Sequence, residues 1–202
     1  MSTEALFAQL KHPNPNLRSR AIWELAEVYD ADTIASLMAN LGEDDVVLRR
    51  SSVKALGAIG PDAVPSVVEA LLHSDSVTVR GSAAKALAQV AVQHSNVPFP
   101  QIGLDGLEKA MADDNPVVHI ASAMALGEVG LQAVEILIQA VNETENLGLA
   151  VSALNALGGI PDERAKAALA AIANDPSKDV YLQETATSAL SRQDLVKGFK
   201  KS

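Results

Sequence analysis

Residues that could carry out chemistry are few in this 202-residue chain, and no enzyme motif contains them. There is no cysteine, which excludes disulfides, thiolate metal sites and cysteine catalysis. Dinucleotide-binding, phosphate-binding, zinc-protease and serine-hydrolase motifs are absent. The four histidines lie far apart, at His12, His73, His94 and His119. We therefore predict no catalytic residue and no metal site, and we expect that the protein is not a complete enzyme alone.

Two pairs of carboxylates, Asp44-Asp45 and Asp113-Asp114, recur at one position of an internal repeat. Aspartate at such a position caps the amino end of a helix, so we interpret these pairs as caps rather than acid–base catalysts, and we expect Asp75 to be a cap as well. Gly60-Pro61 and Gly130 are expected to end helices. His119 occupies a repeat position that holds arginine in earlier repeats, and we interpret it as a degenerate repeat residue.

An internal repeat defines the elements that position every other candidate. Six similar segments begin at Leu17, Leu48, Val79, Val118, Leu149 and Leu182, with spacings of 31, 31, 39, 31 and 33 residues. We number each segment from its second residue as zero. Aliphatic residues at −1, small residues at +3 and leucine at +7 then share one helical face. A second apolar helix is predicted before each segment, over Glu4–Leu10, Asp32–Leu41, Ala63–Leu72, Ile102–Met111, Ala133–Val141 and Arg164–Ala173.

The repeat predicts an all-α fold, a right-handed α-α superhelix (solenoid) of about six HEAT-like helix pairs. The chain has ample aliphatic side chain but few aromatic residues, which favours helices over a β-sandwich. We predict a single solenoid over residues 1–192, followed by a basic tail over 193–202. Its repeats cover approximately residues 1–30, 31–61, 62–100, 101–130, 131–161 and 162–192.

The longest spacing contains about eight extra residues around Gln93–Gly103. Pro98 and Pro100 flank Phe99 there, and proline stops helices and stiffens the backbone. Insertions in solenoids map to loops, often on the binding face. The insertion is either a simple spacer or a recognition loop formed by these three residues.

Arginine recurs at offset zero, as Arg18, Arg49 and Arg80. This position lies beside the core face and near the aspartates of neighbouring turns, which predicts a structural Asp-Arg ladder. His119, Ala150 and Gln183 interrupt the series. We therefore expect the carboxyl half to be held differently or to be open to a partner.

Offsets +1 and +5 point away from the core face and define a surface along the second helices. This predicted concave surface consists of Trp23, Arg50, Lys54, Lys85, Ile120, Met124 and Val151. It changes along the chain from an aromatic residue to cations and then to apolar side chains. It is either covered by loops and neighbouring helices or exposed to a partner or pigment. Offset +8 is always small, which would leave backbone accessible there.

The formal charge is −9, from 16 basic and 25 acidic residues, which argues against nucleic-acid binding. Only Lys109 is basic between Ala86 and Glu163, where ten residues are acidic. That stretch is either a solvated acidic surface or a partner-binding one. The longest apolar run, Ala167–Ala173, is too short to span a membrane, and the amino terminus lacks secretory-signal features. We expect a soluble cytoplasmic protein without membrane insertion.

The repeat pattern of Asp or Asn, a short gap, Val/Leu-Arg, then alanine and leucine resembles the HEAT-like repeats of the phycobilin lyase family. The runs LFAQLKHPNPNLR, VTVRGSAAKALAQVAV, VPFPQIGLDGL and DNPVVHIASAMALGEVG are similar to CpeZ-type members, and CpcF-type lyase subunits are the next most similar.

This resemblance implies a chaperone-like subunit that assists the attachment of a phycobilin to cysteines of a phycobiliprotein. Phycoerythrobilin is the phycobilin that the resemblance favours. The implied partners are a phycobiliprotein subunit (phycoerythrin or phycocyanin) and a larger HEAT-like lyase subunit. No cofactor is expected to bind covalently, although a phycobilin could bind transiently. Two alternatives remain open: a HEAT-like adaptor without a pigment role, and a phycobilisome degradation factor.

Overall fold

The computed structural model describes residues 2–199, with side chains described as far as Gln193. These residues form α-helices and three short 3-10 helices, and no strand occurs among them. The prediction of an all-α solenoid of HEAT-like helix pairs is confirmed. The chain divides into two compact units, Met1–Ala110 and Met111–Ser202.

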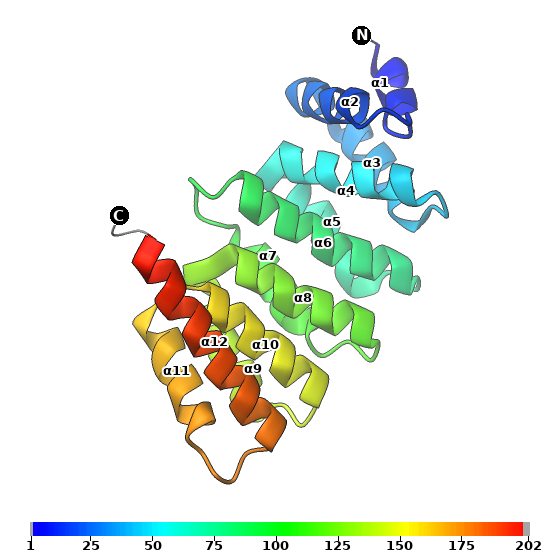
Figure 1. Ribbon diagram of the computed structural model, residues 1–202. Coiled ribbons are helices and arrows are strands. Elements are labelled where there is room, and N and C mark those ends of the chain that lie inside the picture. Colours follow the sequence, from blue (N-terminus) through cyan, green and yellow to red (C-terminus); the bar gives the residue numbers. More distant parts are fainter. Residues whose placement is uncertain (1, 200–202) are drawn as a thin grey trace. The chain divides into compact units, whose positions relative to one another are not determined.

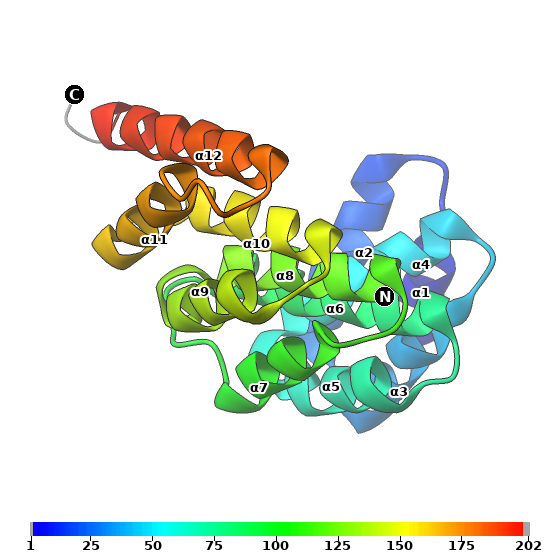
Figure 2. The same ribbon diagram turned by 90° about the horizontal axis from the view of Figure 1, so that it is seen from below.

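The first unit contains two layers of helices (Figures 1 and 2). The second helices of successive pairs, α2, α4 and α6, pack side by side, while α3, α5 and α7 form the other layer. The helices are α1 (Thr3–Gln9), α2 (Pro15–Val28), α3 (Ala31–Ala39), α4 (Val46–Ile59), α5 (Val64–His73), α6 (Val77–Gln93) and α7 (Gln101–Ala110).

The second unit has a similar arrangement (Figure 1), with α10 packed between α8 and α12, α9 packed against α10, and α11 packed against α12. Its helices are α8 (Pro116–Val129), α9 (Val134–Glu143), α10 (Leu147–Gly159), α11 (Glu163–Ala173) and α12 (Val180–Phe199). Because α12 continues to Phe199, much of the predicted tail over 193–202 has a helical backbone. Residues 200–202 lie outside the described part of the chain.

The repeat face forms the core of each unit, as its spacing predicts. The leucines at offset +7 have no exposed surface in the first five repeats, at Leu25, Leu56, Leu87, Leu126 and Leu157. The small residues at +3 are equally buried. Leu190, in the last repeat, is only partly buried. Burial of this one stripe against neighbouring helices is the main stabilising contribution in such a repeat.

Side-chain caps begin each of the second helices about two residues earlier than the sequence predicts. The Asp45 carboxylate accepts hydrogen bonds from the main-chain nitrogens of Val47 (2.8 Å) and Leu48 (3.1 Å), so its predicted capping role is confirmed. The caps predicted at Asp75 and at Asp113-Asp114 are wrong, because Ser76 and Asn115 cap α6 and α8 instead.

Two glycines end helices where the sequence places breaks. Gly60 and Gly130 have φ angles of 87° and 78°, in the left-handed region that glycine adopts without steric cost. They terminate α4 and α8 before short 3-10 helices. The stretches Val46–His73 and Pro116–Glu143 have the length and hydropathy of membrane spans. Each is instead a pair of helices, interrupted at its glycine.

The small residues at offset +8 have a packing role that differs from the predicted exposure of backbone. A Cβ atom added at Gly57 would lie 2.3 Å from the Gln89 Cβ of α6. In the second unit, a Cβ at Gly158 would lie 2.8 Å from the Ala189 Cβ of α12. Small residues here allow neighbouring second helices to approach closely, so the prediction of accessible backbone is wrong at Gly57 and Gly158.

Truncation of the core leucines tests the repeat assignment. We expect Leu56→Ala or Leu87→Ala to lower the free energy of unfolding by about 2–5 kcal/mol, because each leaves a cavity in a fully buried site. Urea denaturation monitored by circular dichroism measures this loss. The exposed Val92→Ala in α6 is the control and should cost less than about 0.5 kcal/mol. A loss that small at both leucines would contradict the assignment.

Candidate binding groove

A groove of about 550 Å³ lies across α2, α4 and α6 of the first unit. It is lined by Pro15, Arg18, Ser19 and Ile22 of α2; by Val46, Val47, Arg49, Arg50, Ser51, Val53 and Lys54 of α4; and by Ser82, Lys85 and Gln89 of α6. Its volume is typical of sites that bind small molecules.

The groove is strongly basic although the protein as a whole is acidic. Its lining includes five cationic side chains, those of Arg18, Arg49, Arg50, Lys54 and Lys85, and no aspartate or glutamate. Charges of one sign gathered in a recess raise the local concentration of ligands of the opposite sign. The groove is therefore suited to an anion.

Arg50, Lys54 and Lys85 are exposed and form no ion pair with any carboxylate in the described part of the chain. Arginines elsewhere do form such pairs, as in the 3.0 Å contact between Arg164 Nη1 and Glu135 Oε1. Arg50 and Lys54 are four residues apart on α4, a spacing at which like charges destabilise a helix. The cluster thus opposes stability, which favours a binding role.

The groove also has an aliphatic component. Ile22 and Val53 are buried beneath it, while Val46 and Val47 are exposed at the start of α4. Serine side chains at Ser19, Ser51 and Ser82 supply neutral hydrogen-bonding groups. The combination fits a ligand or partner segment with an apolar body and acidic groups.

The arginines at offset zero bind main-chain carbonyls. Arg18 Nη1 donates to the carbonyl oxygens of His12 (2.6 Å) and Pro13 (2.9 Å), and Arg49 Nη1 donates to that of Glu43. The prediction that aspartate side chains are the acceptors is wrong for Arg18 and Arg49. These bonds fix each arginine against the turn that precedes its own helix.

The same bond continues where the arginine series ends. A ring nitrogen of His119 lies 3.2 Å from the Asp113 carbonyl oxygen, and Gln183 Nε2 donates to the Lys178 carbonyl oxygen at 2.8 Å. His119 is buried in this role. The expectation that the carboxyl half is held differently is therefore wrong at these two positions, and only Ala150 lacks a polar side chain there.

The predicted surface residues divide between the two units. Arg50, Lys54 and Lys85 come together in the groove of the first unit. Trp23, whose side chain is 55% exposed, lies on α2 and does not line the groove. The apolar candidates belong to the second unit, where Met124 is exposed and where Ile120 and Val151 are partly buried.

Phe99 is buried rather than presented to a partner, although its loop is a candidate for recognition. Its ring fills the space beside Gly103, where a Cβ atom would lie 2.6 Å from Phe99 Cε1. The Pro100 carbonyl accepts a hydrogen bond from the Gly103 nitrogen at 2.9 Å and helps to start α7. Phe99 thus anchors the insertion within the first unit. Of the three residues predicted to form a recognition loop, Pro98 is exposed and Pro100 is partly buried.

A second hollow, near α1 and α3, is lined by Thr3, Glu4, Phe7, Asp30, Asp32, Thr33 and Ser36. The Asp30 carboxylate accepts hydrogen bonds from the main-chain nitrogen of Thr33 (2.8 Å) and from its hydroxyl (2.7 Å). These bonds lower the pKa of Asp30 below its usual value. The hydrogen bonds cap α3, which accounts for Asp30 as a structural residue.

Sequence reasoning missed Arg18 and Arg49 as groove residues, because a structural role alone accounts for their position. Their sequence position could have indicated this, because Arg18 and Arg49 directly precede the outward-facing offset +1. They therefore lie at the edge of the surface that contains Arg50.

The chain is similar to HEAT-repeat proteins along most of its length. A family model described as HEAT repeats matches residues 3–88 and 104–191. "Uncharacterized phycocyanin operon protein Z" of Pseudanabaena tenuis (strain PCC 7409) is 52% identical over 202 residues, covering all of both chains. "Bilin biosynthesis protein CpeZ" of Synechococcus sp. (strain WH8020) is 29% identical over 180 residues, covering 86% of this chain and 96% of the relative.

Among solved structures, the complex of CpcE and CpcF of phycocyanin lyase from Nostoc sp. PCC7120 contains a similar chain. The TM-score is 0.51 and the identity 19%, over 76% of this chain and 96% of the other, which shows a shared fold. The resemblance to the CpeZ-type, HEAT-like proteins is confirmed by these findings. The chain belongs to the HEAT-repeat family and, within it, to the group that contains phycocyanin operon protein Z and CpeZ.

Proposed function

We propose that this protein is an accessory, chaperone-like subunit of a bilin lyase system. It assists attachment of a phycobilin to cysteines of a phycobiliprotein in the cytoplasm by binding a client, which is the acceptor subunit, the partner lyase or the pigment that passes between them. The observation that carries this proposal is the basic groove with an aliphatic floor. The names of the two relatives, which refer to a phycocyanin operon and to bilin biosynthesis, support a role in bilin metabolism.

The groove is suited to binding and lacks groups for the attachment reaction. Attachment joins a bilin to a cysteine sulfur, and this chain has no cysteine that could carry the pigment as a thioether. The lining of the groove contains no histidine, carboxylate or tyrosine that could act as a general acid or base at neutral pH. An accessory role beside a larger HEAT-like lyase subunit follows.

Coexpression tests the accessory role. We expect a phycobiliprotein subunit produced with a bilin supply and this protein alone to gain little chromophore, because the catalytic groups are lacking. Addition of the larger lyase subunit should restore attachment, and this protein should raise its yield further. Absorbance and zinc-enhanced fluorescence of the purified acceptor measure the yield, with phycoerythrobilin and phycocyanobilin compared. Full, stereochemically correct attachment with this protein alone would refute the proposal.

Charge reversal in the groove tests where the client binds. We expect Lys54→Glu combined with Lys85→Glu to abolish most of the gain in yield, because both side chains are unpaired cations of the groove. The melting temperature should change by less than about 2 °C, since both are exposed. Lys11→Glu combined with Lys109→Glu gives the same net charge outside the groove and is the control. Equal effects of the two double variants would remove the groove from the mechanism.

Trp23 offers a separate test of the α2 surface. An exposed tryptophan outside the groove is the type of side chain that often anchors a protein partner. We expect Trp23→Ala to reduce copurification with the acceptor or lyase subunit while preserving the melting temperature. Trp23→Phe, which retains an aromatic ring, should keep most of the interaction. Unchanged copurification of both variants would show that this surface is not used.

A further inference from the structure

We propose that the groove of the first unit binds a small, elongated dicarboxylate with an apolar body, and that Arg18 and Arg49 bind a carboxylate of this ligand. The inference rests on the proposed function, and of the three clients named there it assigns the pigment, rather than a segment of a protein, to the groove. It gives two arginines assigned to the repeat scaffold a second role, in ligand binding.

The dimensions of the groove favour a small molecule over a protein. Its volume of about 550 Å³ is in the range of pockets that enclose most of a ligand of drug size. A stable protein interface uses about 20–30 residues from each partner. The groove is lined by 14 residues of three helices, a smaller area than such an interface needs.

The cations are distributed along the groove in a way that suits two separate acid groups. Arg49 and Lys54 are five residues apart on α4, about 7.5 Å along the helix axis. Arg18 on α2 and Lys85 on α6 extend the two ends of this series to the neighbouring helices. A ligand with two carboxylates several ångströms apart would contact a guanidinium with one and an ammonium with the other.

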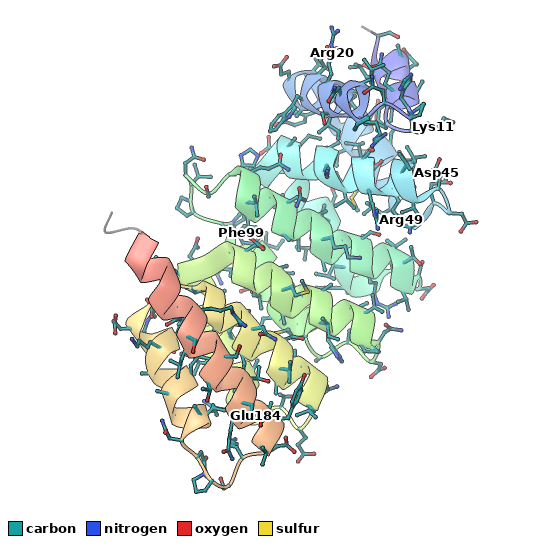
Figure 3. The ribbon with its side chains drawn as sticks, viewed as in Figure 1. Lys11, Arg20, Asp45, Arg49, Phe99 and Glu184 are labelled. Atoms are coloured by element: carbon teal, nitrogen blue, oxygen red, sulfur yellow. The ribbon has the colours of Figure 1, made fainter. Side chains whose placement is uncertain are left out.

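Arg18 and Arg49 are held in position before any ligand binds. In each, Nη1 is bonded to a turn carbonyl, and both side chains are only partly exposed. A guanidinium has five N–H donors in a rigid plane, so a single bonded nitrogen leaves an edge that can bind a carboxylate through two hydrogen bonds. A side chain that is already ordered loses less entropy on binding. Figure 3 shows Arg49 near the amino end of α4, close to Asp45.

The remainder of the lining suits the apolar body of the ligand. Val46 and Val47 provide exposed aliphatic surface, and Ile22 and Val53 lie buried below. No carboxylate among the lining residues would repel the acid groups of the ligand. The charge of the groove and its aliphatic lining therefore both favour an amphipathic ligand with two negative charges.

Arg80 provides a control for the loss of the turn bond. It occupies the same repeat position on α6, and its Nη1 donates to the carbonyl oxygens of Ser74 (2.9 Å) and Asp75 (3.3 Å). It does not line the groove. Loss of the turn bond is thus common to Arg49→Gln and Arg80→Gln, while loss of a groove cation occurs only in the first.

Titration of the purified full-length protein with biliverdin, a linear tetrapyrrole with two propionates, tests the proposal by absorbance and tryptophan fluorescence. We expect Arg49→Gln to weaken binding at least about tenfold, the loss of a charge-assisted contact, and Arg80→Gln to weaken it less than about twofold. Biliverdin dimethyl ester should bind the unaltered protein at least about tenfold more weakly, because its two propionates are esterified and carry no charge.

Three outcomes would overturn the inference. These are equal binding of the ester, equal effects of the two arginine variants, and no binding of biliverdin by the unaltered protein. In the third case a gain in attachment yield on coexpression would leave the proposed function intact, and sensitivity of acceptor binding to Arg49→Gln would assign the groove to a protein segment. If Arg49→Gln does not fold, Arg49→Lys keeps the charge without the planar fork and should still weaken binding.

Discussion

Burial of the small residues at offset +3 and of the leucines at offset +7 is the constraint on which the rest of the structure depends. A hydrogen bond from the side chain at offset zero to the preceding turn supports this packing in the repeats other than that of Ala150. It joins the first turn of a second helix to a carbonyl five or six residues earlier, as in Arg18 with His12 and Gln183 with Lys178. Because the chain reverses at that turn, the bond holds the turn against the first residues of its helix, while burial of the apolar stripe sets the rotation of the helix about its axis. That rotation directs offsets +3 and +7 into the core and offsets +1 and +5 away from it.

The groove shows what this arrangement permits. Each repeat contacts mainly its neighbours, so stability is set by the buried stripe and by close approaches such as Gly57 against α6. Outward positions are then free to hold residues that oppose stability locally, including the like charges of Arg50 and Lys54. A basic recess can therefore exist in a protein with a net charge of −9 without affecting the core.

The fold could be predicted because its signal is periodic, whereas several contacts could not because they depend on side-chain geometry. The spacing of Leu56 and Leu87 defines a buried helical face in any HEAT-like stack. It does not show that Ser76 rather than Asp75 caps α6, since both are good capping residues. Offsets +1 and +5 predict the groove cations Arg50, Lys54 and Lys85. Arg49 is not predicted as a groove residue from these offsets, because its position beside the core face and near the turn aspartates is already explained by a structural role.

The outward side chains differ between the two units, being cationic in the first and partly apolar in the second. This difference is possible because core and surface positions are separate in each repeat. Residues 1–110 contain nine lysines and arginines, and five of them line the groove. In the second unit, α8 and α10 have no lysine or arginine, and their outward side chains include Met124 and Val151. Since the leucines at +7 remain constant while the +5 residues change from Lys54 to Met124, each repeat could vary its surface without altering its packing. The differences in surface chemistry between repeats therefore lie mainly at positions that core packing leaves unconstrained.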